Sequence, residues 1–74
     1  MGLRLSISLR EDTEKPRLVW VSLRSVDDFP CNKMASDFFN GGGHLNASGG
    51  HLNMTIDEAV EVVRQAIAAY ASQL

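Results

Sequence analysis

Five of the six glycines in this chain surround one histidine in residues 41–50, which run Gly-Gly-Gly-His-Leu-Asn-Ala-Ser-Gly-Gly. Three consecutive glycines are unfavourable in a helix or a strand, because glycine loses more backbone entropy on folding than other residues. Successive N–H groups of such a turn can form a concave nest that attracts anions. His44 can add a donor or a positive charge. Gly41, Gly42, Gly43 and His44 therefore predict an anion cradle with phosphate as its expected ligand, whereas three glycines alone would favour a flexible loop.

Four further polar residues could contribute to such a site. Arg24 closes a predicted strand, and its planar guanidinium suits bidentate phosphate contact or stacking on a base, although a surface arginine is the plainer interpretation. Ser25 could assist by hydrogen bonding. Asn46 and Ser48 could contact a base or ribose, or could instead fix the loop through side-chain bonds to the backbone.

The same residues predict neither a metal site nor a catalytic centre in this chain. His44 and His51 have no Asp, Glu or Cys neighbour at the spacing that a zinc site requires. Hydrolysis of a phosphodiester at neutral pH needs an activated water, usually held by one or two metal ions. Trp20 and Lys33 are interpreted as a core side chain and a solvated side chain.

Two strands precede the glycine segment. Apolar residues alternate with polar ones over Leu3–Arg10, which is the period of a half-buried strand. In Arg17–Arg24, both the odd- and the even-numbered positions between Arg17 and Ser22 are apolar, which predicts a more central strand. A polar turn ending at Pro16 joins the two, so an antiparallel hairpin is expected.

Two helices and a third strand complete the expected fold. Pro30–Phe39 predicts a short helix with Cys31, Met34, Ala35 and Phe38 on its apolar face, ended by Asn40-Gly41. His51–Met54 predicts a short strand. Thr55 and Glu58 form a capping box, and the helix that follows places on one face Ile56, Ala59, Val60, Val63, Ile67, Tyr70 and Leu74. The expected fold is α+β, a three-stranded mixed sheet with two helices on one face in the order β-β-α-loop-β-α.

Three motifs in this order resemble a known family. Gly41–Gly49 resembles the Gly-Gly-Gly-His-x-x-Ala-Ser-Gly motif of the C-terminal, DHH-associated domain of the DHH phosphoesterases. Val21–Ser25 resembles the strand that precedes this motif in the oligoribonuclease and phosphoadenosine-phosphatase (exopolyphosphatase-related) branch, and Asn32–Ala35 resembles its helix. Pro30 and Asn40 depart from the family pattern, where an acidic cap and a further glycine are common.

The resemblance implies a role for the chain. It implies one substrate-binding domain over residues 1–74, part of a longer phosphoesterase whose N-terminal DHH domain holds manganese or magnesium. The ligand would be adenosine bisphosphate or short single-stranded RNA or DNA, contacted through Arg24, Ser25, the glycines, His44, Asn46 and Ser48. Alternatives are the same domain from a cyclic-dinucleotide phosphodiesterase, a single-strand exonuclease or an exopolyphosphatase, and a stand-alone nucleic-acid-binding module.

Composition limits these interpretations without deciding among them. The 74 residues allow one small domain, and 45% hydrophobic residues indicate a globular chain. A net charge of −2 disfavours a broad electrostatic grip on long nucleic acid. One cysteine, Cys31, predicts a buried thiol and a cytoplasmic setting. No signal peptide or membrane span is expected. Dimerisation or a partner domain would cover any remaining apolar surface.

Overall fold

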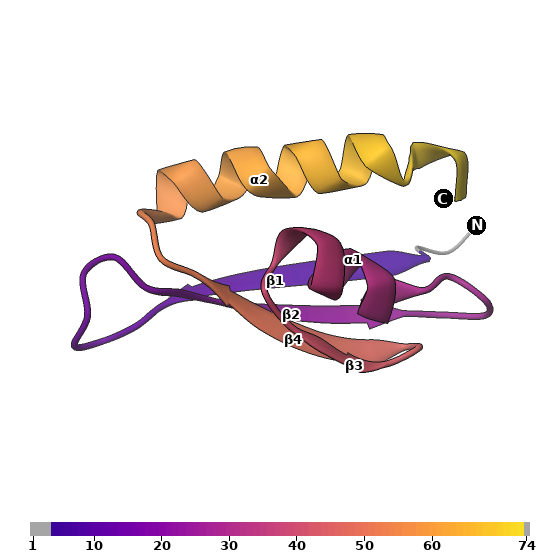
Figure 1. The fold of residues 1–74 in the computed structure, drawn as a ribbon, viewed down its shortest axis with the longest axis horizontal. Coiled ribbons are helices and arrows are strands. Elements are labelled where there is room, and N and C mark those ends of the chain that lie inside the picture. Colours follow the sequence, from indigo (N-terminus) through magenta and orange to yellow (C-terminus); the bar gives the residue numbers. More distant parts are fainter. Residues whose placement is uncertain (1–3, 74) are drawn as a thin grey trace.

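The computed structural model describes residues 4–73 as a four-stranded sheet with two helices. The sheet order is β1-β2-β4-β3, and each neighbouring pair is antiparallel. Both helices cover the same face of the sheet (Figure 1). The elements run in the order β1 Leu5–Glu11, β2 Val19–Ser25, α1 Cys31–Phe38, β3 Gly42–His44, β4 Ala47–Leu52, α2 Ile56–Ala69 and a final 3-10 turn, Ala71–Gln73.

The placement of two helices on one face is confirmed, but the expected three-stranded mixed sheet is wrong. The predicted loop between α1 and the third strand is itself a β-hairpin, in which β3 pairs with the first half of β4 around Leu45 and Asn46. The third predicted strand, His51–Met54, corresponds to the end of β4, which begins at Ala47 and ends at Leu52. Leu3, the start of the first predicted strand, lies outside the described residues.

Close backbone packing explains why this hairpin needs glycine. Gly43 has φ +147°, and a Cβ there would lie 2.7 Å from the carbonyl oxygen of Ala47. A Cβ at Gly50 would overlap the carbonyl of Phe39, whose oxygen accepts a 2.8 Å hydrogen bond from the His51 amide. The glycines therefore let β4 run against its partner strand and against the end of α1.

The core lies between the sheet and the helices. Val19, Val21 and Leu23 alternate along β2 and are almost fully buried. They pack in one cluster with residues from the helices, from β4 and from the segments next to α1, including Phe29, Met34, Ala35, Phe39, Leu52 and Ala59. The intervening residues of β2 are exposed, which leaves the other face of the sheet uncovered.

The helix ends follow the expected chemistry. Pro30 and Phe39 bound α1, and Asn40 takes the left-handed conformation expected of a helix stop, with φ 52°. The Cys31 thiol is buried, as predicted. Thr55 and Glu58 form the predicted capping box of α2.

The predicted apolar face of α2 needs one correction. Val60 and Ile67 are 43% and 41% exposed, and Ala66 is buried in their place. The helix is therefore rotated relative to the expected face, and Leu74 lies outside the described residues. Within residues 4–73, neither helix combines the length and apolar character needed to cross a membrane.

Candidate functional site on the open sheet face

The open face of the sheet is the candidate site. We use this name for the strand residues whose side chains point away from the helices. The pairing register arranges them in three rows across the sheet. The Arg24–His44 row holds Ser6, Arg24, Ala47 and His44; the middle row holds Ser8, Ser22, Gly49 and Gly42; the Trp20 row holds Arg10, Trp20 and His51.

Arg24 and His44 come from strands that are not neighbours, yet they lie in one row. Ala47 of β4 pairs with Arg24 of β2 on one side and with His44 of β3 on the other. Two strand spacings separate the two backbones, about 10 Å. Both side chains are exposed, and only the methyl group of Ala47 stands between them in the row. Two long polar side chains can therefore approach one ligand from opposite sides.

The side chains of the middle row project little from the sheet, because all of its residues are small. Gly42 and Gly49 have no side chain, and Ser8 and Ser22 are the next smallest members of the row. A Cβ at Gly42 would meet nothing within 4 Å, so the fold itself does not require glycine there. A ligand lying across the sheet could rest on this row.

Positive charge predominates on the open face although the whole chain has a net charge of −2. Arg10 and Arg24 belong to it, and the strand positions of its three rows, all within residues 4–73, include no Asp or Glu. Neither arginine takes part in the ion pairs of the described chain, which join Arg4 to Asp28 and Arg17 to Glu58. The face is thus suited to an anion.

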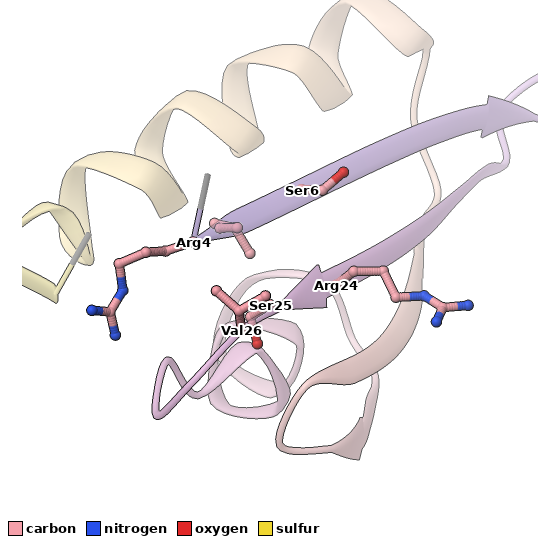
Figure 2. A pocket seen from close by; sticks show the side chains of 6 residues that line it. Arg4, Ser6, Arg24, Ser25 and Val26 are labelled. Carbon is pink, nitrogen blue, oxygen red and sulfur yellow. The ribbon is translucent and has the colours of Figure 1, made fainter. Parts of the chain in front are cut away.

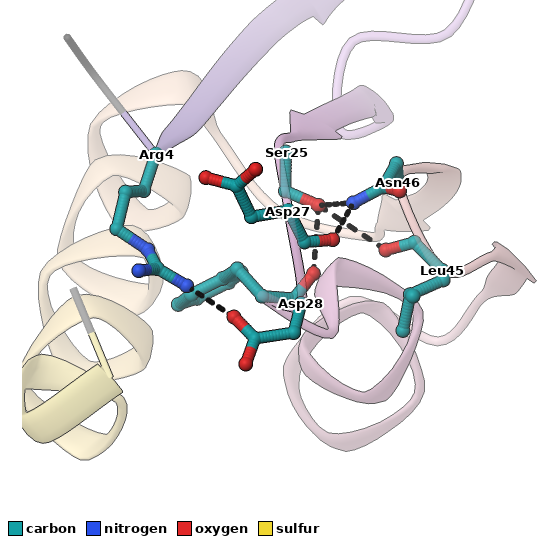
Figure 3. A network of polar contacts seen from close by, with 7 residues as sticks. Arg4, Ser25, Asp27, Asp28, Leu45 and Asn46 are labelled. Carbon is teal, nitrogen blue, oxygen red and sulfur yellow. Dashed lines mark hydrogen bonds and ion pairs between the residues drawn. The ribbon is translucent and has the colours of Figure 1, made fainter.

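Three predicted ligand residues lie elsewhere. Ser25 is buried, and its hydroxyl is within hydrogen-bonding distance of the Phe29 and Leu45 carbonyls, at 2.8 and 3.1 Å. The Asn46 amide donates to the Ser25 hydroxyl at 3.0 Å and to the Asp27 carbonyl at 3.1 Å (Figure 3). These bonds tie the hairpin turn to the end of β2.

Ser48 also faces the helix side of the sheet. It pairs with the buried Leu23, and its hydroxyl donates a 2.8 Å hydrogen bond to the His44 carbonyl. The eight predicted site residues therefore do not form one site. Arg24, Gly42 and His44 share the open face, whereas Ser25, Asn46 and Ser48 make bonds within the chain. Of the other two, Gly43 pairs with Ser48, and Gly41 bonds to the end of α1.

The glycine segment does not form the curled loop expected for an anion nest. Gly42, Gly43 and His44 are extended and paired with β4, and the Gly41 amide donates to the Ala35 carbonyl at 3.1 Å. The prediction of a loop conformation is wrong, because this segment is the edge strand of the sheet and is paired with β4 on one side. Phosphate binding by these residues stays a prediction, now with side chains in place of amides.

A shallow hollow of about 120 Å³ lies where β1 begins and β2 ends. Arg4 and Arg24 are among its lining residues, but Figure 2 shows their guanidinium groups pointing in opposite directions. Arg4 pairs with Asp28 at 2.6 Å. The hollow therefore does not bring the two positive charges together.

Sequence reasoning misplaced Trp20. It was expected in the core, yet it is 39% exposed on the open face, and its ring lies 6.1 Å from that of His51. The signal was present, because Trp20 shares its strand parity with Ser22 and Arg24 while Val19, Val21 and Leu23 share the other.

No group of three or more His, Cys, Asp or Glu residues within 4–73 is arranged to hold a metal ion. The open face offers guanidinium, imidazole and indole groups to a ligand.

No protein-family model matches this chain, and no curated protein is significantly similar to it. Among solved structures, it is similar to the crystal structure of an exopolyphosphatase-related protein from Bacteroides fragilis. The identity is 57% and the TM-score 0.82, over 89% of this chain and 18% of that one. This chain thus spans less than a fifth of the length of that protein, and it is closely similar to that part of an exopolyphosphatase-related protein.

Proposed function

We propose that this chain is the substrate-binding part of a phosphoesterase, and that the Arg24–His44 row holds a phosphate of its substrate. The observation that carries the proposal is the register that brings Arg24 and His44 onto one exposed face, on either side of Ala47. The similarity to part of an exopolyphosphatase-related protein supports the phosphoesterase class.

The substrate we propose is a nucleotide or a short single-stranded oligonucleotide. A guanidinium can contact two phosphate oxygens at once, and a protonated imidazole donates from both nitrogens. The low middle row gives the remainder of the ligand a place to lie.

The reaction itself would require a divalent metal, manganese or magnesium, held by residues outside this chain. One or two such ions supply the activated water for hydrolysis. This chain would hold the scissile bond over them, which lowers the entropic cost of reaching the transition state.

Inorganic polyphosphate is the second candidate ligand, favoured by the similarity to an exopolyphosphatase-related protein. It offers the same phosphate chemistry without a base. Its binding would depend on Arg24 and His44 and would not involve an aromatic contact.

Binding measurements with the 74-residue chain test the proposal. Isothermal titration with adenosine 3′,5′-bisphosphate, a 5′-phosphorylated diadenylate and tripolyphosphate should detect binding of at least one phosphate ligand. Arg24→Ala and His44→Ala should each weaken it about 10- to 150-fold, the range expected when a charge-assisted hydrogen bond is lost.

Arg64→Ala is the matched control, because it removes one positive charge from the exposed side of α2. It should leave the affinity unchanged. The proposal is wrong if no phosphate ligand binds, or if Arg64→Ala weakens binding as much as Arg24→Ala does.

A further inference from the structure

The Trp20 row is a second cluster of chemically distinctive side chains on the open face. Trp20 of β2 pairs with Arg10 of β1 on one side and with His51 of β4 on the other. The indole and imidazole ring centroids are 6.1 Å apart, with the planes inclined by 54°. The described chain thus presents two adjoining aromatic rings, with Arg10 as the next residue of the row, on the side of the sheet away from the core.

The indole is held in place although it is exposed. Its Nε1 donates a 3.0 Å hydrogen bond to Asp12, whose other carboxylate oxygen accepts from the amides of Glu14 and Lys15. The hydrogen bond from Trp20 and, to a smaller extent, the two from the amides lower the pKa of the Asp12 carboxyl below its usual value. Asp12 is therefore a carboxylate at neutral pH and anchors the indole edge. An exposed aromatic ring that is already oriented loses little entropy when a ligand stacks on it.

The spacing of the rows relates this cluster to the proposed phosphate site. Trp20 and Arg24 are four residues apart on one strand, which separates their rows by about 13 Å. That distance exceeds the span from a phosphate to its own base, so a base at Trp20 would belong to the next nucleotide. The low middle row lies directly between the two, where the sugar and backbone of such a ligand would pass.

We propose that Trp20 and His51 form a base-stacking subsite for a single-stranded oligonucleotide whose phosphate lies in the Arg24–His44 row. This subsite rests on the proposed function, because it fixes the second nucleotide of the same ligand. Base–aromatic stacking tolerates any base, since every base has a π face. The subsite therefore selects for the presence of a second base and not for a sequence.

Intrinsic fluorescence tests the subsite directly, because Trp20 is the single tryptophan of the chain. Titration of the 74-residue chain with 5′-phosphorylated diadenylate should quench Trp20 emission. Adenosine 3′,5′-bisphosphate and tripolyphosphate should bind without comparable quenching. Backbone amide shifts of Gly42 and His44, followed by NMR in the same titrations, report occupancy of the phosphate end independently.

Substitutions separate stacking from phosphate binding. Trp20→Ala should weaken diadenylate binding about 5- to 150-fold, the range for loss of one base stack, and leave bisphosphate binding unchanged. Trp20→Phe keeps a π face and should retain most of the affinity, and His51→Ala should weaken diadenylate binding as well. Circular dichroism of each variant confirms that the fold is kept.

The outcomes distinguish this proposal from the function on which it rests. If diadenylate shifts the Gly42 and His44 amides while Trp20 emission and the Trp20→Ala affinity are unchanged, the stacking subsite is wrong and the phosphate site stands. If no phosphate ligand moves either signal, both proposals are overturned. Equal quenching by bisphosphate would show that the two sites lie within one nucleotide, which also contradicts the subsite.

Discussion

Single residues decide how the glycine-rich segment should be interpreted. The glycines of this segment differ in what they do for the fold. Gly43 and Gly50 are needed because a Cβ would meet the backbone of the chain itself. Gly42 is exposed and unobstructed. The sequence alone does not distinguish these glycines, but the structure requires glycine at Gly43 and Gly50 and does not require it at Gly42.

Gly42→Ala and Gly43→Ala are a matched pair of substitutions that separates folding from binding. Gly43→Ala places a Cβ 2.7 Å from the Ala47 carbonyl oxygen at φ +147°, so it should lower the melting temperature measurably. Gly42→Ala should change the free energy of unfolding by no more than about 0.5 kcal/mol, as is typical of surface substitutions. Its melting temperature should therefore stay close to that of the unsubstituted chain.

Binding should respond differently in the same pair. A methyl group at position 42 would project from the middle row, where the proposed oligonucleotide crosses the sheet. Gly42→Ala should therefore weaken diadenylate binding through steric contact with the ligand. Thermal denaturation and isothermal titration of both variants provide the check. Unchanged affinity in a folded Gly42→Ala variant would show that no ligand lies over the middle row.

At the scale of elements, patterning predicted most of the fold. Alternation identified β1, a mostly apolar run identified β2, and Thr55 with Glu58 marked the start of α2. Asn40 marked the end of α1 through its tolerance of positive φ. These signals are local, so a single sequence is enough to detect them.

The β3–β4 hairpin could not be predicted in the same way. Its strands contain glycines at positions where side-chain alternation would otherwise appear, and the backbone of Gly50 lies close against Phe39 at the end of α1. That contact joins two separate elements, so a local pattern does not reveal it. The candidate site was affected in turn, because the face that Arg24, His44 and Trp20 share follows from pairing with β4.

The contact between the two helices offers a titration test. Tyr70, at the end of α2, donates a 2.8 Å hydrogen bond to Asp37 of α1. Burial, and then the Asp37 carboxylate, raise the pKa of Tyr70 to about 12. Because the folded-state pKa lies above the unfolded value near 10, Tyr70 contributes stability below about pH 10 that is lost as the pH rises through about 12.

Phenolate absorbance isolates this group, since Tyr70 is the single tyrosine of the chain. In the folded chain the phenolate should form near pH 12, and in denaturant near pH 10. Asp37→Asn removes the carboxylate and should lower the midpoint, whereas Asp57→Asn, on the first turn of α2, should not. A folded-state midpoint near 10 would contradict the described contact.

At the scale of the whole molecule, the fold is a half-covered sheet. The radius of gyration is 11.8 Å, close to the roughly 11 Å expected of a compact chain of this length. The helices occupy one face of the sheet (Figure 1). The open face carries the arginines and exposed rings described above. A chain this small has a thin margin of stability, so occupation of the open face should alter its unfolding strongly.

Thermal denaturation with ligand tests that coupling. A ligand at one hundred times its dissociation constant stabilises the native state by about 2.7 kcal/mol, which for a domain of this size raises the melting temperature by about 10–20 °C. Phosphorylated diadenylate should produce such a shift, and the shift should shrink as salt is added, because cations bound to the phosphates are released on binding. An Arg24→Ala, His44→Ala double variant should melt cooperatively without ligand and lose most of the shift, while Arg64→Ala should keep it. An equal shift in the double variant would place the bound ligand away from the open face, since removing both proposed phosphate contacts would then have cost no binding energy.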